Sequence, residues 1–260
     1  MIEVVSTFEG ELPLLISVPH DGCHIPDDLR ARMTPAGLAV PDTDWHVAEL
    51  YDFARDLGAS IQLANYSRYV VDLNRSATDD ALYPGQIVTG LCPEQTFSGE
   101  DIYQEGGVTE EEKLARISTY WGPYHARIES TLAAMRTKHG YALLWDAHSI
   151  PSIVPRLFDG ELPELNIGTN SGKSCAASIE AAVIKVASAS PYSAVLNDRF
   201  KGGHITRHYG DPEKRVYAIQ LEIAQRAYMD ETTTVFDAEK AGRLRATLRQ
   251  LLEAFLSAAP

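Results

Sequence analysis

The sequence predicts an α/β fold in which a mixed, mostly parallel sheet is covered by helices on both faces. Short apolar runs typical of buried strands alternate along the chain with segments whose apolar residues recur at helical spacing. This alternation, with no internal repeat or linker, favours strands joined by crossover helices. The length of 260 residues is enough to bury a large core, and we expect residues 1–260 to form one domain.

The first part of the chain contains three predicted strands and one predicted helix. Runs of apolar and β-branched residues predict the strands at 12–18, 60–63 and 69–73. Between them, apolar residues recur every three or four positions from residue 43 to residue 57. We expect a helix there with Asp42 or Thr43 as its N-cap.

The second part continues the alternation. Thr109 and Glu112 form a capping box that opens a long helix, which Pro123 is expected to kink. Further strands are predicted at 141–145, near 194–196 and at 216–223, and further helices at about 175–189 and at 237–258. Residues 149–173 are rich in Pro, Gly, Asn and Ser, and an irregular segment of this length is often functional.

Charge and composition exclude several classes of partner. The formal net charge of -13 argues against nucleic acid, because phosphate binding requires a basic surface. No apolar stretch approaches the length of a membrane helix, and the N-terminus does not resemble a signal peptide. The three cysteines have no CxxC spacing, so we expect a reduced, cytoplasmic protein. An anionic substrate would need arginines collected locally at its site.

Two histidines stand directly after predicted buried strands. His20 follows the first strand and His148 follows the run YALLW, each beside an aspartate. Ligands of α/β sheets bind beyond the carboxyl ends of the strands. One such histidine is more often a hydrogen-bonded core residue, but a pair favours a metal, and zinc uses three protein ligands with one open position in catalytic sites.

The third ligand is less clear from the residues. Asp44, in the cluster PDTDWH, is our candidate, although an aspartate at this place could equally cap the helix that follows. His24 is the alternative, but Gly22 and Pro26 argue against a helix that would put it on the same face as His20.

Other strand-end and loop residues carry useful charges. Glu222 interrupts an apolar strand, and a buried carboxylate there would either form an ion pair or act as a general base beside a metal. Arg75 and Arg207 could bind carboxylates, with Asp72 as the structural partner of one of them, and Arg156 is a weaker candidate. Gly202 and Gly203 would allow the backbone to approach a ligand closely.

Cysteine catalysis is an alternative mechanism. Cys23 lies near two histidines, and an imidazole-activated thiolate could attack an amide. Adjacent residues seldom present their side chains to one another in this way, and no oxyanion-hole pattern is visible.

Six segments resemble the N-formylglutamate deformylases (N-formylglutamate amidohydrolases) of histidine degradation. They occur in the same order over residues 12–230, and they read LLISVPHDG, PDTDWHVAELYDFARDLGAS, YSRYVVDLNR, YALLWDAHSIPS, FKGGHITRHYG and AIQLEIAQ. The resemblance implies hydrolysis of N-formyl-L-glutamate to L-glutamate and formate. It also implies a three-layer α/β/α sandwich of the zinc exopeptidase type, with one divalent metal, expected to be Zn²⁺, per chain.

The resemblance also assigns roles to single residues. WDAHS and PHDG make His148 and His20 metal ligands, and QLE makes Glu222 the general base. DLNR makes Asn74 and Arg75 the group that grips a substrate carboxylate. In the wider superfamily a glutamate ligand follows the first histidine by three residues, whereas this sequence has Cys23 there, so we expect Asp44 to be the middle ligand.

The segment 203–208 completes the expected site. We expect Arg207 to hold the second carboxylate and His204 to contact the substrate near the oxyanion. The competing functions are a deacylase of another N-acyl acidic amino acid, such as acetylated aspartate or succinylated glutamate, and a non-catalytic metabolite-binding protein.

Overall fold

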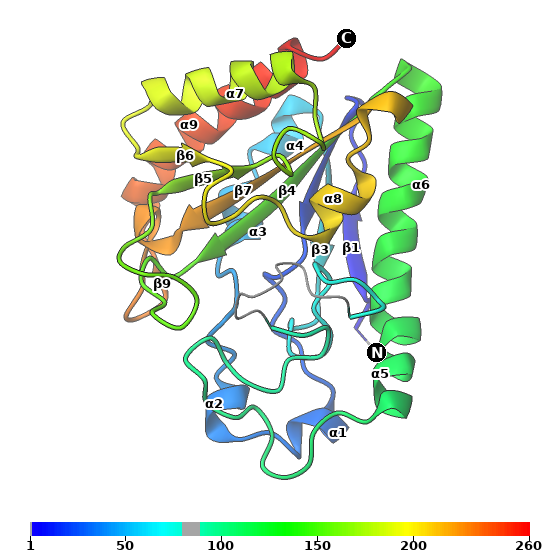
Figure 1. Ribbon diagram of the computed structural model, residues 1–260, viewed down its shortest axis with the longest axis vertical. Helices are drawn as coiled ribbons and strands as arrows, with labels where there is room; N and C mark the ends of the chain where they lie inside the picture. The colour runs from blue at the N-terminus through cyan, green and yellow to red at the C-terminus, as the bar shows by residue number, and fades with distance from the viewer. Residues whose placement is uncertain (1, 80–88) are drawn as a thin grey trace.

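In the computed structural model, which describes residues 2–79 and 89–260, a seven-stranded sheet crosses the molecule (Figure 1). The strand order is β1-β3-β2-β4-β7-β5-β6. The strands are β1 (Val5–Phe8), β2 (Leu14–Val18), β3 (Ser60–Ala64), β4 (Ala142–Ile150), β5 (Leu165–Gly168), β6 (Ala194–Leu196) and β7 (Val216–Ala224). A separate hairpin pairs β8 (Met229–Asp230) with β9 (Val235–Phe236).

The sheet is mixed, with a parallel centre. Strands β3, β2, β4 and β7 are parallel to one another, whereas β1 is antiparallel to β3 at one edge. On the other side β5 runs antiparallel to β7, and β6 is parallel to β5. The carboxyl ends of β2, β4 and β7 therefore meet at one edge, and the register places His148 directly beside Glu222.

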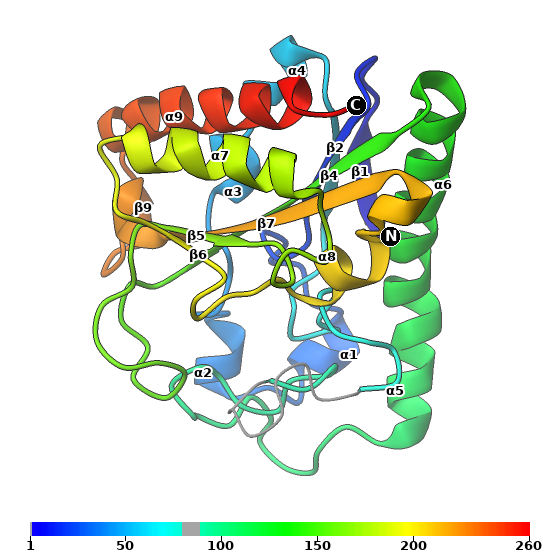
Figure 2. The ribbon, with the colours of Figure 1, turned by 45° about the horizontal axis from the view of Figure 1, so that its top comes forward.

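Helices cover both faces of the sheet (Figure 2). One face packs against α3 (Val47–Leu50), α4 (Ala54–Leu57), α7 (Ala177–Ala189) and α9 (Ala238–Ser257). The other face packs against α6 (Gly122–His139) and α8 (His204–Tyr209). Alternate residues of β4 divide between the two cores, with Trp145 on the first face and Leu144 on the second. The predicted α/β fold with a mixed sheet between two helical layers is confirmed.

A third apolar cluster lies beyond the carboxyl ends of the central strands. It includes Ile25, Leu29, Met33, Tyr69 and Ile102, all of them buried. The short helices α1 (Asp27–Arg30) and α2 (Pro35–Leu38) belong to this region, in the lower half of Figure 1. Irregular chain is thus packed firmly against the edge of the sheet where the strand-end side chains lie.

The long helix begins as the capping box predicts and is then interrupted. The Thr109 hydroxyl accepts a hydrogen bond from the backbone N–H of Glu112 (3.2 Å), and α5 (Glu110–Arg116) follows. A π-helical turn, Ile117–Trp121, separates α5 from α6, and the N–H of Gly122 bonds the carbonyl of Ile117. The interruption comes just before Pro123, which cannot donate a backbone hydrogen bond.

Two element predictions were wrong. Residues 69–73 form turns and loop rather than a strand, because side chains instead of a neighbouring strand take up their carbonyls: Arg116 bonds Val70 O and His125 bonds Leu73 O. The helix predicted from residue 43 begins only at Val47 and breaks into α3 and α4.

The structure also contains elements that the sequence did not predict. Strand β1 was not predicted, and β5 lies inside the segment 149–173 that was expected to be irregular. The 3₁₀ turns at Pro212–Lys214 and Gln225–Ala227 flank β7. Within the described residues, no helix combines the length and apolar character required to cross a bilayer.

Candidate metal centre and active-site cavity

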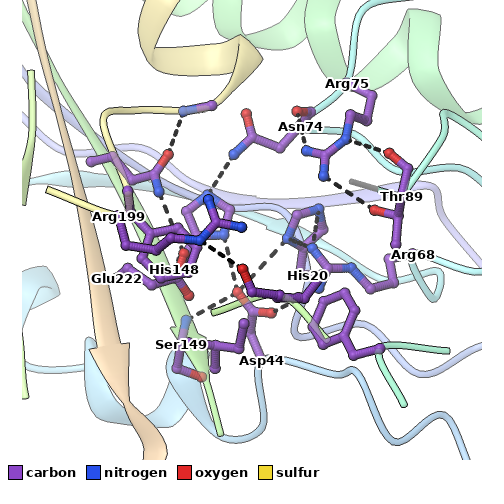
Figure 3. A pocket seen from close by; sticks show the side chains of 16 residues that line it. His20, Asp44, Arg68, Asn74, Arg75, Thr89, His148, Ser149, Arg199 and Glu222 are labelled. Carbon is purple, nitrogen blue, oxygen red and sulfur yellow. Dashed lines mark hydrogen bonds and ion pairs between the residues drawn. The ribbon is translucent and has the colours of Figure 1, made fainter. Parts of the chain in front are cut away.

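A cavity opens at the carboxyl ends of β2, β4 and β7 (Figure 3). Its wall carries His20, Asp44 and His148 together with Glu222, and its apolar surface comes from Phe97, Ile150, Leu157 and Phe200. The strand-end residues singled out in the sequence thus reach one common space.

His20, Asp44 and His148 form a group that could hold a metal ion. One ligand atom from each lies within 4.8 Å of the other two, and all three side chains are buried. The Nδ1 atom of His148 is 3.0 Å from Asp44 Oδ2, and the Nδ1 atom of His20 is 3.7 Å from the same oxygen. Both imidazoles therefore turn the same nitrogen toward one carboxylate.

The opposite nitrogen of each histidine faces another buried carboxylate. His20 Nε2 lies 2.8 Å from Asp72 Oδ1, and His148 Nε2 lies 3.1 Å from Asp146 Oδ1. Histidines that bind metals usually have a carboxylate or carbonyl at the second ring nitrogen, which fixes the ring and raises its basicity. Two imidazoles and one carboxylate, each held from behind, fit a divalent metal of the zinc type.

Asp44 reaches the centre from an irregular segment that is tied to two strands. Its backbone N–H bonds the carbonyl of His20 (3.1 Å), and its Oδ2 accepts the backbone N–H of Ser149 (3.1 Å). The N-cap position of α3 is occupied by His46, so Asp44 does not cap that helix. The structure places Asp44, rather than His24, beside the two histidines; the ring of His24 packs edge-on against Tyr66.

The electrostatics mark the space between Asp44 and the histidines as a place for positive charge. Burial disfavours the charged imidazolium of His148, but the Asp146 and Asp44 carboxylates outweigh burial and raise its pKa well above the usual value. Burial would likewise raise the pKa of Asp44, yet hydrogen bonds from His148 and His20 and the charge of Arg68 lower it overall. A divalent cation bound here would take the place of the proton that His148 otherwise directs at Asp44.

Glu222 stands next to this group on β7. Burial, reinforced by the nearby charge of Asp44, raises its pKa to about 8, although His148 and Arg68 act in the opposite direction. Gln220, two residues earlier and on the same face, donates from Nε2 to Glu222 Oε2 (3.4 Å) and accepts the backbone N–H of Gly203 (2.6 Å). Glu222 is thus a buried, basic carboxylate beside the candidate metal ligands.

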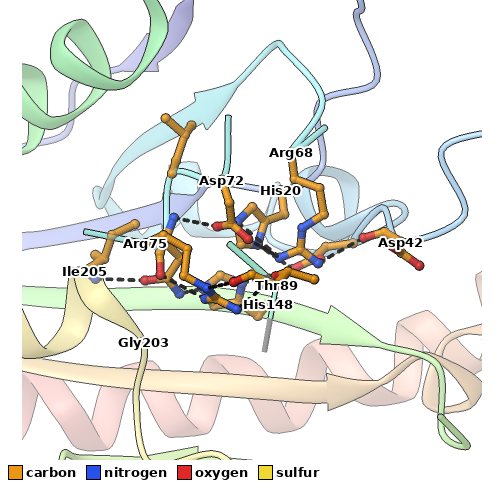
Figure 4. Close-up of polar contacts among 12 residues, drawn as sticks. His20, Asp42, Arg68, Asp72, Arg75, Thr89, His148, Gly203 and Ile205 are labelled. Carbon is orange, nitrogen blue, oxygen red and sulfur yellow. Dashed lines mark hydrogen bonds and ion pairs between the residues drawn. The ribbon is translucent and has the colours of Figure 1, made fainter. Parts of the chain in front are cut away.

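Arg68 lies beside His20, on the side of the metal group away from Glu222 (Figure 3), and its contacts with its neighbours are drawn in Figure 4. Its Nη2 donates to His20 Nδ1 (2.6 Å), and its Nη1 donates to the carbonyl of Asp42 (3.1 Å). Its guanidinium also stacks over Phe97 at 5.1 Å and lies 3.6 Å from Asp72. This cation is therefore fixed within reach of anything bound between His20 and Asp44.

Arg75 and Arg199 add two more guanidinium groups to the wall of the cavity. Arg75 donates from Nε to the carbonyl of Thr89 (2.8 Å), from Nη2 to the hydroxyl of Thr89 (3.1 Å), and from Nη1 to the carbonyl of Asn74 (3.1 Å). The Nε of Arg199 donates to the carbonyl of Leu157 (3.0 Å). The cavity wall thus carries three arginines beside the carboxylates of Asp44 and Glu222. Guanidinium groups bind carboxylates well, so this lining suits an anionic ligand.

Comparisons with known proteins agree with this geometry. Residues 12–229 match the family model described as N-formylglutamate amidohydrolase. The chain belongs to the N-formylglutamate amidohydrolase family. It is 50% identical to an N-formylglutamate deformylase of Pseudomonas aeruginosa and 49% identical to one of Pseudomonas putida, over 99% of this chain and 97% of each relative.

Solved structures share the fold of this family member. A crystal structure of N-formylglutamate amidohydrolase from Ralstonia eutropha JMP134 superposes with a TM-score of 0.83 at 24% identity, covering 97% of both chains. A gene product of Agrobacterium tumefaciens gives a TM-score of 0.74 at 20% identity, covering 96% of this chain and 95% of that one. At these identities the likeness concerns the fold.

Some expected site residues of this family member lie elsewhere. Arg207 and His204 are on α8, and neither is among the described residues that line the cavity. Arg207 Nε donates to the carbonyl of Gly202 (2.7 Å). His204 packs in a group of aromatic rings with Trp121, and burial, together with the charge of His208, lowers its pKa to about 4, so that it is neutral near pH 7.

Asn74 lines the cavity, whereas Arg156 and Cys23 are not among the described residues that line it. The Asn74 amide lies 2.9 Å from His148 Nε2 through its nitrogen, and its oxygen accepts the N–H of Ile205 (2.8 Å). Arg156 bonds the carbonyl of Thr96 (2.9 Å). Cys23 is exposed, and desolvation of the thiol with the charge of Asp21 raises its pKa, which disfavours a nucleophilic thiolate.

Sequence reasoning overlooked Arg68, Arg199 and Gln220. Arg68 lies inside the YSRYVVDLNR segment, seven residues before Arg75, and Gln220 is the first residue of QLE, so both could have been found from those motifs. Arg199 belongs to a loop after β6 and carries no local signal that separates it from other loop arginines.

Proposed function

We propose that this chain hydrolyses N-formyl-L-glutamate to L-glutamate and formate, using a divalent metal held by His20, Asp44 and His148. The observation that carries the proposal is the buried histidine–aspartate–histidine group, which lies beside Glu222 in a cavity lined by three arginines. The sequence identity to N-formylglutamate deformylases supports the choice of substrate. Zn²⁺ is our preferred ion, because two imidazoles and one carboxylate are a common ligand set for catalytic zinc.

The metal would supply Lewis acidity toward the formyl carbonyl and toward water. Glu222 would take a proton from the attacking water; a divalent cation bound beside it would lower its raised pKa of about 8 and keep the carboxylate free to accept that proton. It would then deliver the proton to the amide nitrogen as the carbon–nitrogen bond breaks. The products are formate and L-glutamate with a free amino group.

Arg68 is our candidate for stabilising the oxyanion that develops on the formyl oxygen. Its Nη2 lies 2.6 Å from His20 Nδ1 and its Nη1 lies 3.7 Å from Asp44 Oδ1; a metal that takes the lone pair of His20 Nδ1 would release the Nη2 N–H for the formyl oxygen. A fixed cation in a buried site can stabilise developing negative charge by several kcal/mol, commonly about 3 kcal/mol for one donor. This assignment replaces the expected contribution of the 203–208 segment.

Arg75 and Arg199 would hold the two carboxylates of the substrate. Among the described residues, the hydrogen bonds of Arg75 occupy three of its five N–H donors, so that one N–H on each terminal nitrogen remains for a carboxylate. Arg199 takes the place that we expected for Arg207, because it lines the cavity. Asn74 then acts by orienting His148 and α8 rather than by gripping the substrate.

This arrangement explains how an acidic protein can accept a dianion. The formal charge of the chain is -13, which repels an anionic substrate on average. Three arginines around one cavity would offset that repulsion where the substrate carboxylates bind. Within this proposal the reaction takes place in the cytoplasm and ends a route of histidine degradation, and the free state of Cys23, Cys92 and Cys175 supports a reducing compartment.

The deciding experiment measures formate release by the purified protein. We expect turnover of N-formylglutamate, loss of turnover after chelation, and recovery on addition of Zn²⁺, with about one metal ion per chain in elemental analysis. Acetyl- and succinyl-glutamate serve as comparison substrates and separate this activity from that of other deacylases. Full activity in a metal-stripped sample would overturn the metal-dependent mechanism.

A further inference from the structure

The segment that carries Asn74 and Arg75 is held by side chains from a helix rather than by a neighbouring strand. His125 Nε2 donates to the carbonyl of Leu73 (2.9 Å), and Trp121 Nε1 donates to the carbonyl of Arg75 (3.0 Å). The carbonyl of Asn74 accepts the backbone N–H of His204 (3.3 Å). Three successive carbonyls of this segment are therefore bonded from outside it.

Trp121 and His125 form a rigid pair. Their rings stack with centroids 3.7 Å apart and an interplanar angle of 19°. The hydroxyl of Tyr209 lies 2.9 Å from His125 Nδ1, so that both ring nitrogens of His125 have partners when the imidazole is neutral. Burial, opposed by the Leu73 carbonyl, lowers the pKa of His125 to about 3 and keeps it neutral.

The π-helical turn explains how one helix can reach both ends of the loop. Arg116 bonds the carbonyl of Val70 (2.9 Å), and Trp121 bonds the carbonyl of Arg75. Five residues in a regular α-helix are about 140° apart around the axis, at about 100° per residue. A turn closed by i→i+5 hydrogen bonds, as between Ile117 and Gly122, brings the two side chains onto the same face.

We propose that Trp121 and His125 are positioning residues that hold the Arg75 guanidinium for the substrate carboxylate. The proposal rests on the function proposed above, in which Arg75 binds that carboxylate. Neither side chain touches the substrate; both act through the main chain of Leu73 and Arg75. The aromatic rings of Trp121, His125 and His204, which pack together, thereby support substrate binding indirectly.

The first test compares Trp121→Phe with Trp145→Phe. Both substitutions remove an indole N–H that makes one hydrogen bond, but Trp145 bonds the hydroxyl of Tyr51 (2.9 Å) in the core on the other face of the sheet. For Trp121→Phe we expect KM for N-formylglutamate to rise about fivefold with kcat within about twofold, because binding is weakened equally in ground and transition states. Trp145→Phe should leave KM unchanged even if Tm falls.

The inhibition constant of L-glutamate gives an equilibrium readout of the same site. It should rise in Trp121→Phe by about the same factor of five as KM. His125→Gln retains an N–H where Nε2 lies and should restore binding, whereas His125→Leu should raise KM about fivefold. Equal KM values in the Gln and Leu variants would contradict the role of the Leu73 hydrogen bond.

A double-mutant cycle decides whether Trp121 acts through Arg75. In an Arg75→Ala background, Trp121→Phe should change KM by less than about twofold, because the group that it positions is gone. If Arg75→Ala itself has no effect on KM, the proposed carboxylate site is wrong. If Arg75→Ala raises KM but Trp121→Phe does not, the carboxylate site stands and the positioning role is wrong.

Discussion

Replacing Arg75 tests the substrate site most directly, and the expected rise in KM can be worked out from the contacts of its guanidinium group. Among the residues that the structure describes, Thr89 and the Asn74 carbonyl occupy three of the five guanidinium N–H groups, leaving one on each terminal nitrogen. A carboxylate that accepts both makes two charge-assisted hydrogen bonds, each worth about 1.5 kcal/mol at the lower end of the usual range. Losing both costs about 3 kcal/mol, which corresponds to about a 100-fold rise in KM.

The assay is formate release over a range of N-formylglutamate concentrations for Arg75→Ala and Arg75→Lys. The lysine variant keeps the charge but not the fork, so its KM should rise about tenfold. Arg243→Ala on α9 is the matched control, because it removes the same charge from an exposed side chain on the opposite face of the sheet. A rise in KM below about twofold in a folded Arg75→Ala protein would show that this residue is structural.

Two further outcomes follow from the buried groups. Glu222→Gln should lower kcat by about 10²- to 10⁴-fold while metal content stays near that of the parent, since Glu222 is not part of the metal group; an unchanged kcat would remove it as the base. The second concerns acid stability. Because burial lowers the pKa of His125 from 6.5 to about 3, its contribution to the free energy of unfolding is complete above pH 6.5 and is lost as the pH falls toward 3. Between pH 6.5 and 5 the metal-free parent should lose about 2 kcal/mol more than His125→Gln in urea titrations, at about 1.4 kcal/mol per pH unit; parallel pH profiles would contradict this.

The sequence predicted the parts of the site that sit at the ends of regular strands. His148 and Glu222 follow apolar runs that fold as β4 and β7, so their side chains had to meet at the carboxyl edge of the sheet. Asp44 was harder, because it lies in an irregular segment whose path depends on contacts with Ser149 and His20. Such contacts between distant segments leave no periodic pattern in the sequence.

Which arginines line the cavity could not be predicted from the residues that surround each of them in the sequence. Arg207 was expected because an acidic protein needs local arginines to bind an anion, and the nearby Gly202 and Gly203 suggested close approach of the backbone to a ligand. In the structure a Cβ on Gly203 would lie 2.3 Å from the Asn74 amide nitrogen, so the glycine makes room for a neighbouring side chain instead. Residues 69–73 misled in a similar way, because their apolar run is buried in two separate clusters while side chains bond their carbonyls.

The π-helical turn between α5 and α6 also constrains how the gene can change. Such a turn corresponds to one residue more than a regular helix of the same path would need. Deleting a residue such as Thr119 would let α5 and α6 fuse into a continuous helix of the same path, with Arg116 and Trp121 then four residues apart on one face. The capped start at Thr109 and the Trp121 contact with Arg75 could then both be kept, whereas a deletion within the regular turns of the helix would rotate the following residues by about 100° and shorten the helix by about 1.5 Å. The chain can therefore lose one residue at this turn with little change to the site, while insertions or deletions elsewhere between Thr109 and His125 should move Trp121 or His125 away from the carbonyls that they hold.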